Sequence, residues 1–203
     1  MRVTGDGRGA VVCVNGGQGH EAPGTWSATL EWLVTRVAPA LPGLRFGEVR
    51  YRIKSWKRLD MCVEDAGAAI EALGGERTLL LGFSMGGAVS IRAAAHDGVE
   101  EVIGLGPWIP DRLDVSPLRG KRLVVIHGAL DRWLPRIPGV SPSSSRRGFE
   151  RAIAAGADGS YTTIAGAVHG TALRTPGGGA VPLPRARRWA ELVSAELERF
   201  QSS

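Results

Sequence analysis

Residues 79–88 have the sequence Leu-Leu-Leu-Gly-Phe-Ser-Met-Gly-Gly-Ala, in which a short apolar run ends in small residues. Such a run is typical of a strand buried in a parallel sheet, and residues 88–95 beyond it predict a helix. Ser84 would then lie on a sharp turn between strand and helix. The turn needs small neighbours two residues away on each side, because larger side chains would collide with it. It would present the serine hydroxyl near N–H groups at a helix start, which predicts a nucleophile; the simpler interpretation is a glycine-rich turn with an ordinary serine.

The length and composition of the chain favour one globular domain. Its 203 residues, 43% hydrophobic and 22% charged, suffice for one full core, so we expect a single domain over residues 1–203. Cys13 and Cys62 are too few for a disulfide framework, and we expect both to be buried free thiols. The sequence begins with no basic-plus-apolar leader and contains no apolar run near membrane-spanning length. We therefore expect a cytoplasmic protein without a membrane partner.

The positive charge of the chain does not point to nucleic acid. The net charge is +5, but the basic residues are mostly arginines scattered among acids. The tightest group is Arg185, Arg187 and Arg188, which fits a solvated helix face. We therefore expect no nucleic-acid partner, although a modest preference for small anions is compatible with this charge.

Apolar and β-branched runs alternate with helical patterns along the chain, which predicts a parallel sheet with helices on both faces. The expected fold class is α/β, a three-layer αβα sandwich. We expect residues 1–9 to be a tail or lead-in and residues 175–182 to be a flexible loop. Helices are predicted from Thr25 or Ser27 to 39, and at 60–73, 88–95, 145–155 and 185–200. Six parallel strands are predicted near 10–14, 45–50, 78–82, 100–105, 121–127 and 160–164.

A serine, an acid and a histidine each follow a predicted strand, in the chain order Ser84, Asp131, His169. Because ligands collect at the carboxyl ends of parallel strands, these side chains are expected at one edge of the sheet. A serine hydroxyl needs a base to take its proton, and an imidazole base needs an acceptor on its other nitrogen. The set therefore predicts nucleophilic catalysis.

Each member of this set has a simpler interpretation or a rival. Asp131 could be a turn residue or helix cap, and His169 a solvated loop histidine. His20, His96 and His127 are the rival bases, and His127 could instead orient Asp131 by a hydrogen bond. The histidines lack paired spacing and each cysteine stands alone, so we expect no metal and no cofactor.

These motifs resemble the α/β-hydrolase superfamily, specifically small serine hydrolases of the esterase, thioesterase and dienelactone-hydrolase-like kind. The matching pieces are residues 82–87, 127–131 and 166–169, and the resemblance covers nearly the whole chain. It implies that Ser84 is the nucleophile, Asp131 the acid and His169 the base. It also implies that the strand before Ser84 is central. The oxyanion hole would be formed by the N–H groups of Gly17 and Met85, with Gln18 as the near alternative.

The chain departs from these relatives in three places. Many of them carry His-Gly where this chain has Asn15-Gly16, a change that affects loop support more than chemistry. Residues 106–120 are too short for a helical lid domain, which predicts a minimal fold and an open site. Dienelactone hydrolases use a cysteine where this chain has Ser84. The expected substrate contacts are Gln18, Trp108 and Trp133, with Trp56 a further candidate at the rim.

The predicted function is hydrolysis of a carboxylic ester or thioester of a small substrate through an acyl-serine intermediate. Acyl transfer, amide hydrolysis and lyase chemistry use the same parts, and a binding module without turnover is the alternative of a different class. Short acyl chains are expected, because a missing lid leaves little apolar wall. Arg52 and Arg132 add an expected preference for an anionic acyl or leaving group.

Overall fold

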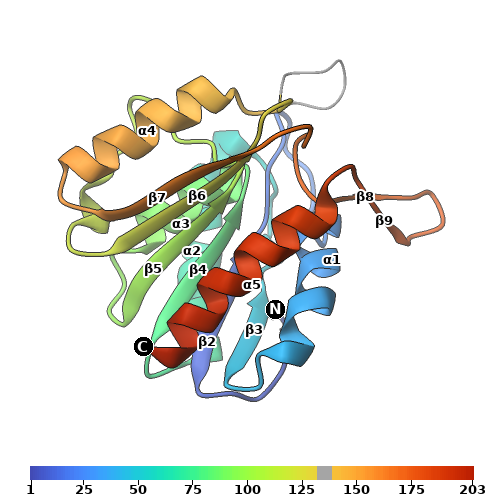
Figure 1. The fold of residues 1–203 in the computed structure, drawn as a ribbon, viewed down its shortest axis with the longest axis horizontal. Helices are drawn as coiled ribbons and strands as arrows, with labels where there is room; N and C mark the ends of the chain where they lie inside the picture. The colour runs from blue at the N-terminus through green and yellow to red at the C-terminus, as the bar shows by residue number, and fades with distance from the viewer. Residues whose placement is uncertain (132–138) are drawn as a thin grey trace.

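The computed structural model describes residues 1–131 and 139–203. Its main feature is a seven-stranded sheet with the order β1-β3-β2-β4-β5-β6-β7 (Figure 1). Strands β2 to β7 are parallel to one another, and β4 is the central strand, next to β2. The six predicted strands are confirmed, with bounds Gly9–Val14 (β2), Leu44–Glu48 (β3), Thr78–Phe83 (β4), Val99–Leu105 (β5), Arg122–Gly128 (β6) and Asp158–Ile164 (β7).

Helices cover both faces of this sheet, as the alternating pattern predicts. Figure 1 shows α1 and α5 in front of the sheet and α2 and α3 behind it. The two apolar clusters of the core agree, because one contains residues of α1 and α5 and the other contains residues of α2, α3 and α4. The helices span Ala28–Val37 (α1), Leu59–Leu73 (α2), Met85–Ala93 (α3), Pro142–Ala154 (α4) and Ala186–Ser202 (α5). This is the predicted three-layer αβα arrangement.

The central strands are apolar on both sides because each face is covered by a helical layer. In β2, Val12 and Val14 pack toward α2 and α3, while Val11 and Cys13 pack toward α1 and α5. A strand that is buried on both faces needs an apolar residue at every position rather than at alternate ones. Cys13 and Cys62 are both buried free thiols, as expected.

Three expectations about irregular segments are wrong. Residues 2–4 are not a tail but strand β1 (Arg2–Thr4), antiparallel to β3, and Arg2 holds it by hydrogen bonds of 2.9 and 2.8 Å to Glu48. The segment 175–182 is not only a loop, because β9 (Ala180–Pro182) pairs with β8 (Ala172–Arg174) in a hairpin. Helix α4 begins at Pro142 rather than near 145, since proline is well suited to the first turn of a helix.

The connection between β5 and β6 is short, as expected for a fold without a lid. Residues 106–121 contain loops and one turn of 3-10 helix, η3 (Ser116–Leu118), and no helical insertion. Two similar turns, η1 (Ala38–Ala40) and η2 (Trp56–Arg58), lie elsewhere. Among the described residues, no helix combines the length and the apolar character needed to cross a membrane.

Candidate active site

Ser84 lies between β4 and α3 in a backbone conformation that residues other than glycine rarely adopt, with φ 55° and ψ −118°. Its small neighbours are required by packing. A Cβ atom added at Gly82 would lie 2.5 Å from the Gly86 carbonyl oxygen, and one added at Gly86 would overlap the Val14 carbonyl oxygen. The predicted turn, with its need for glycine on both sides of the serine, is therefore confirmed.

The loop after β5 holds the Ser84 backbone in place. The Ser84 N–H donates to the Leu105 carbonyl at 3.0 Å, and the Ser84 carbonyl accepts from the Trp108 N–H at 2.9 Å. In the first turn of α3, a Cβ atom at Gly87 would lie 3.0 Å from the Pro107 Cα and closer still to its Cβ. The serine turn and this loop thus form one packed unit.

Asp131 and His169 form a hydrogen-bonded pair at the carboxyl ends of β6 and β7. His169 Nδ1 lies 2.6 Å from Asp131 Oδ2, and the other carboxylate oxygen accepts from the Val140 N–H at 2.9 Å. The Asp131 side chain is fully buried and that of His169 is 10% exposed. This contact leaves His169 Nε2 as the ring nitrogen that can accept a proton from a substrate-side group.

A second histidine, His127, also contacts the Asp131 carboxylate, as the sequence suggested. Its Nε2 atom lies 3.1 Å from Asp131 Oδ2 and 3.0 Å from the Val140 carbonyl oxygen. The imidazole is fully buried and stacks on Tyr161, with ring centroids 6.2 Å apart. Two histidines therefore share one buried carboxylate, and only His169 reaches the surface.

Hydrogen bonding decides the charge of Asp131. Burial by itself would raise the pKa of this carboxyl, but hydrogen bonds from His127 and His169 oppose burial and leave the pKa below its ordinary value. Asp131 is consequently ionised at neutral pH, as a partner of a protonated imidazole must be.

Several contacts join the Ser84 turn to the Asp131–His169 pair. The ring of Phe83, the residue before Ser84, has its centroid 4.8 Å from that of His169. A Cβ atom at Gly106, which has φ 49°, would lie 3.0 Å from Asp131 Oδ2 and 3.2 Å from His169 Nδ1. Among the described residues, the structure records no hydrogen bond between Ser84 Oγ and His169. In enzymes without bound substrate, the hydrogen bond between a nucleophile and its base is often long.

The loop after β2 brings Gly17 against the start of α3. A Cβ atom at Gly17 would lie 3.2 Å from the Met85 Cβ and closer still to its Sδ, so the two residues are in tight contact. Within the described part of the chain, no acceptor is recorded for the N–H of either residue. The side-chain nitrogen of Gln18 lies 3.0 Å from His20 Nε2, and the backbone carbonyl of Gln18 accepts from the Trp56 N–H.

A cavity of about 450 Å³ opens beside Ser84. Trp108 and Trp56 contribute to its wall, as the sequence suggested, but Gln18 does not. Trp133 and Arg132 lie outside the described residues. The residues that line the cavity are Gly17, Trp56, Lys57, Ser84, Met85, Trp108, Arg112, Gly139 and Val140.

Two charged residues of this cavity escaped the sequence analysis. Lys57 and Arg112 line it, whereas Arg52, which was expected near the site, is bound instead to Glu64 and Asp65 of α2. The basic and aromatic stretch 52–57 was a signal for Lys57. Nothing in the sequence around Arg112 marks it.

The other two histidines lie away from Asp131. His20 is exposed in the loop after β2, and His96 packs against α2, where a Cβ atom at Gly67 would lie 2.7 Å from its Nε2. In the described ranges, no group of three or more His, Cys, Asp or Glu side chains is arranged to hold a metal ion.

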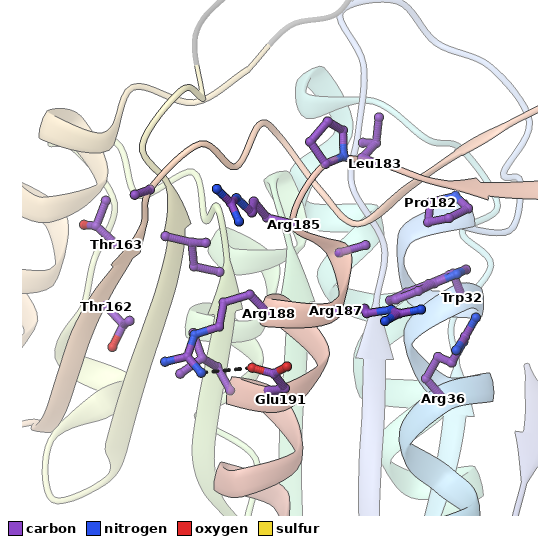
Figure 2. Close-up of a pocket in the computed structure, with 15 residues that line it drawn as sticks. Trp32, Arg36, Thr162, Thr163, Pro182, Leu183, Arg185, Arg187, Arg188 and Glu191 are labelled. Carbon is purple, nitrogen blue, oxygen red and sulfur yellow. Dashed lines mark hydrogen bonds and ion pairs between the residues drawn. The ribbon is translucent and has the colours of Figure 1, made fainter.

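A larger cavity, of about 1010 Å³, is elsewhere, between β7 and the start of α5 (Figure 2). Arginines of α1 and α5 surround it, and Figure 2 shows Arg188 bound to Glu191. None of Ser84, Asp131 and His169 lines this cavity. The smaller cavity is the candidate site because it contains the serine on the strained turn.

A family model described as the alpha/beta hydrolase family matches residues 11–199 of this chain. The matched region begins within β2 and ends within α5. Of the elements described above, only β1 lies wholly outside it. No curated protein sequence matches the chain.

Solved structures of esterases and a lipase are similar to this chain along its whole length. A monoacylglycerol lipase from Paleococcus ferrophilus has a TM-score of 0.68 at 16% identity, with 97% of this chain and 96% of that chain covered. The esterase EaEST from Exiguobacterium antarcticum has a TM-score of 0.68 at 14% identity, with 97% and 94% covered. The esterase PE8 has a TM-score of 0.69 at 15% identity, with 98% and 97% covered. At these identities the likeness shows a shared fold.

Proposed function

Because the chain belongs to the alpha/beta hydrolase family, we propose that it is a serine hydrolase that cleaves a carboxylic ester or thioester of a small substrate. The observation that carries this proposal is the strained turn at Ser84, with φ 55°, beside a buried Asp131–His169 pair. Strain of this kind persists where surrounding packing enforces it, and it is common at functional sites. Here the strain keeps a hydroxyl at the mouth of a cavity.

In the proposed reaction, Ser84 Oγ attacks the carbonyl carbon while His169 Nε2 takes the hydroxyl proton. The tetrahedral intermediate collapses to an acyl-serine, and His169 returns the proton to the departing alcohol or thiol. Water then attacks the acyl-serine by the same two proton transfers, which releases the acid and restores Ser84. Asp131 stays ionised throughout and stabilises the imidazolium through the 2.6 Å contact.

We assign the oxyanion hole to the N–H groups of Gly17 and Met85. Met85 is the first residue of α3 and lines the cavity, so its N–H has no partner within the helix and lies at the positive end of the helix dipole. Gly17 lies against Met85, which supports its N–H as the second donor. Removing one donor of this kind costs enzymes about 10²–10³ in kcat.

A fluorophosphonate probe tests this proposal, because it phosphonylates only an activated serine. Wild-type protein should be labelled and should hydrolyse p-nitrophenyl acetate, and Ser84→Ala should abolish both. Ser90→Ala is the matched control, since Ser90 is a buried serine of the same helix whose hydroxyl has no recorded partner among the described residues. Absence of labelling in folded wild-type protein would contradict catalysis and favour a binding module on a hydrolase fold.

A further inference from the structure

Two cationic side chains face the cavity beside Ser84 without an acidic partner. Lys57 belongs to η2, and Arg112 lies in the loop after β5. Among the described residues that line the cavity there is no Asp or Glu. Among the described residues, no ion pair is recorded for either side chain, and the remaining segment 132–138 contains no acidic residue that could supply one.

Three other cations in neighbouring segments are, by contrast, paired with acids. Arg58 pairs with Glu21 at 2.7 Å, and Arg52 pairs with Asp65 at 2.6 Å. Arg92 pairs with Asp60. Lys57 and Arg112 differ from these three neighbours, because no acid among the described residues forms an ion pair with either of them.

The cavity continues past Arg112 into a second one of about 530 Å³, which shares Trp56, Trp108 and Arg112 with the first. The acids of this extension already have partners. Asp60 pairs with Arg92, and Asp114 accepts from the Ser116 N–H and hydroxyl, each at 2.9 Å. Arg112 lines both cavities together with Trp56 and Trp108, whereas Asp60 and Asp114 line the extension and not the cavity beside Ser84.

We infer that the substrate of the proposed hydrolase is an anionic ester, which carries a carboxylate or another small anionic group a few bonds from the scissile carbonyl. The carbonyl would lie at Ser84 and the anionic group at Lys57 and Arg112. The tryptophan rings would flank the chain that connects them. This inference rests on the proposed function and adds the class of substrate to it.

Matched esters that differ in one charge provide the test. Hydrolysis of monomethyl glutarate and of neutral dimethyl glutarate is followed by pH-stat, and an anion on the alcohol side is tested with O-acetylglycolate against its methyl ester. We expect kcat/KM to favour the anionic member of at least one pair by about tenfold, mainly through KM. The preference should shrink in 0.5 M salt, because screening weakens exposed charges.

Charge-removing variants assign the preference to the two cations. The double variant Lys57→Gln/Arg112→Gln should lower the anionic-to-neutral ratio of kcat/KM by about tenfold. The double variant Lys57→Gln/Arg112→Lys, which keeps one charge, should recover part of that ratio. Arg58→Gln is the matched control, because it removes an equal charge one residue from Lys57 but outside the lining. Its ratio should equal that of the wild type.

Three outcomes overturn the inference. The first is equal or faster hydrolysis of both neutral esters by wild-type protein. The second is an anionic preference that survives the double variant. The third is turnover of none of these esters by protein that the fluorophosphonate probe labels at Ser84, which leaves the hydrolase proposal standing. Loss of both labelling and turnover would instead overturn the proposed function, and this inference with it.

Discussion

At the scale of single residues, the buried carboxylate of Asp131 is the most constrained group of the site. It has no contact with water and accepts from His127, His169 and the Val140 N–H. Its ionised form depends on these donors, since burial alone would raise its pKa. His127 is accordingly a positioning residue, which acts on the reaction through Asp131.

Replacement of His127 by leucine should raise the pKa of Asp131, because burial remains while one hydrogen bond is lost. A carboxyl with a raised pKa takes up its proton at a higher pH, so the acid limb of kcat should move toward neutral pH. We expect kcat to fall by about tenfold with KM nearly unchanged, a part of the contribution that general-base catalysis makes. The pH profile of p-nitrophenyl acetate hydrolysis provides the measurement.

Two further variants separate positioning from folding. His127→Gln keeps an N–H donor and should recover part of the lost rate, whereas His96→Gln, which lies against α2, should leave the pH profile unchanged. An unaltered acid limb in folded His127→Leu protein would show that Val140 and His169 suffice to orient Asp131.

The sequence predicts residues well where a short motif carries the geometry. Asp131 and His169 follow neighbouring parallel strands, so their meeting follows from topology. Lys57 lies on the short 3-10 turn η2 and Arg112 in the loop after β5, and the path of such connecting segments depends on tertiary contacts that periodicity does not encode. Arg52 shows the same limit, because two acids of α2 draw it away from the cavity.

At the scale of elements, the fit between α3 and the loop after β5 explains the glycine pair that follows Ser84. A side chain at Gly86 would collide with the carbonyls at the end of β2, and a side chain at Gly87 would collide with Pro107. Glycine is a poor helix former, so its presence twice in the first turn of α3 costs helix stability. Close packing against these neighbours explains why glycine is present at both positions despite that cost.

Replacement of Gly87 by alanine should destabilise the protein. Overpacking against the rigid Pro107 ring costs about 1–3 kcal/mol, while alanine regains roughly 1 kcal/mol of helix propensity, so the net loss should be up to about 2 kcal/mol. Urea denaturation measures it. Gly177→Ala is the control, since the nearest atom to its Cβ would be Thr175 Oγ1 at 4.0 Å. Equal stability of the two variants would show that the loop yields to the added methyl group.

Strands and helices of ordinary length were predictable, and the three-residue strands were not. Strands β1, β8 and β9 are too short to show a period of two. What creates β1 is a distant ion pair, because Arg2 binds Glu48 at 2.7 Å from a position 46 residues away. Patterns within a short window carry no information about such a contact.

At the scale of the whole molecule, the absence of an inserted lid between β5 and β6 governs access to the site. The described loops leave a cavity of about 450 Å³ at Ser84, which suits a small ligand. Among the described residues that line it, the large apolar side chains are chiefly Trp56 and Trp108. A long acyl chain would therefore remain in water and contribute little binding energy.

A series of p-nitrophenyl esters with acyl chains of two to sixteen carbons should show the highest kcat/KM at two to four carbons. Each methylene that finds no apolar wall gains none of the roughly 0.8 kcal/mol that burial would provide. Assays below the micelle-forming concentration keep the long esters comparable. A rate that rises steadily to sixteen carbons would contradict this expectation and would indicate that loops around the cavity close over the substrate.

The small strand β1 also has a consequence for how copies of this protein meet one another. An uncovered sheet edge is a template for pairing with another chain, and β3 would present such an edge if β1 were absent. Three residues with a charged arginine offer few backbone groups for pairing, so β1 works as a shield against aggregation. Trimming residues 1–4 would leave every residue of the candidate site in place and yet expose the chain to edge-to-edge assembly.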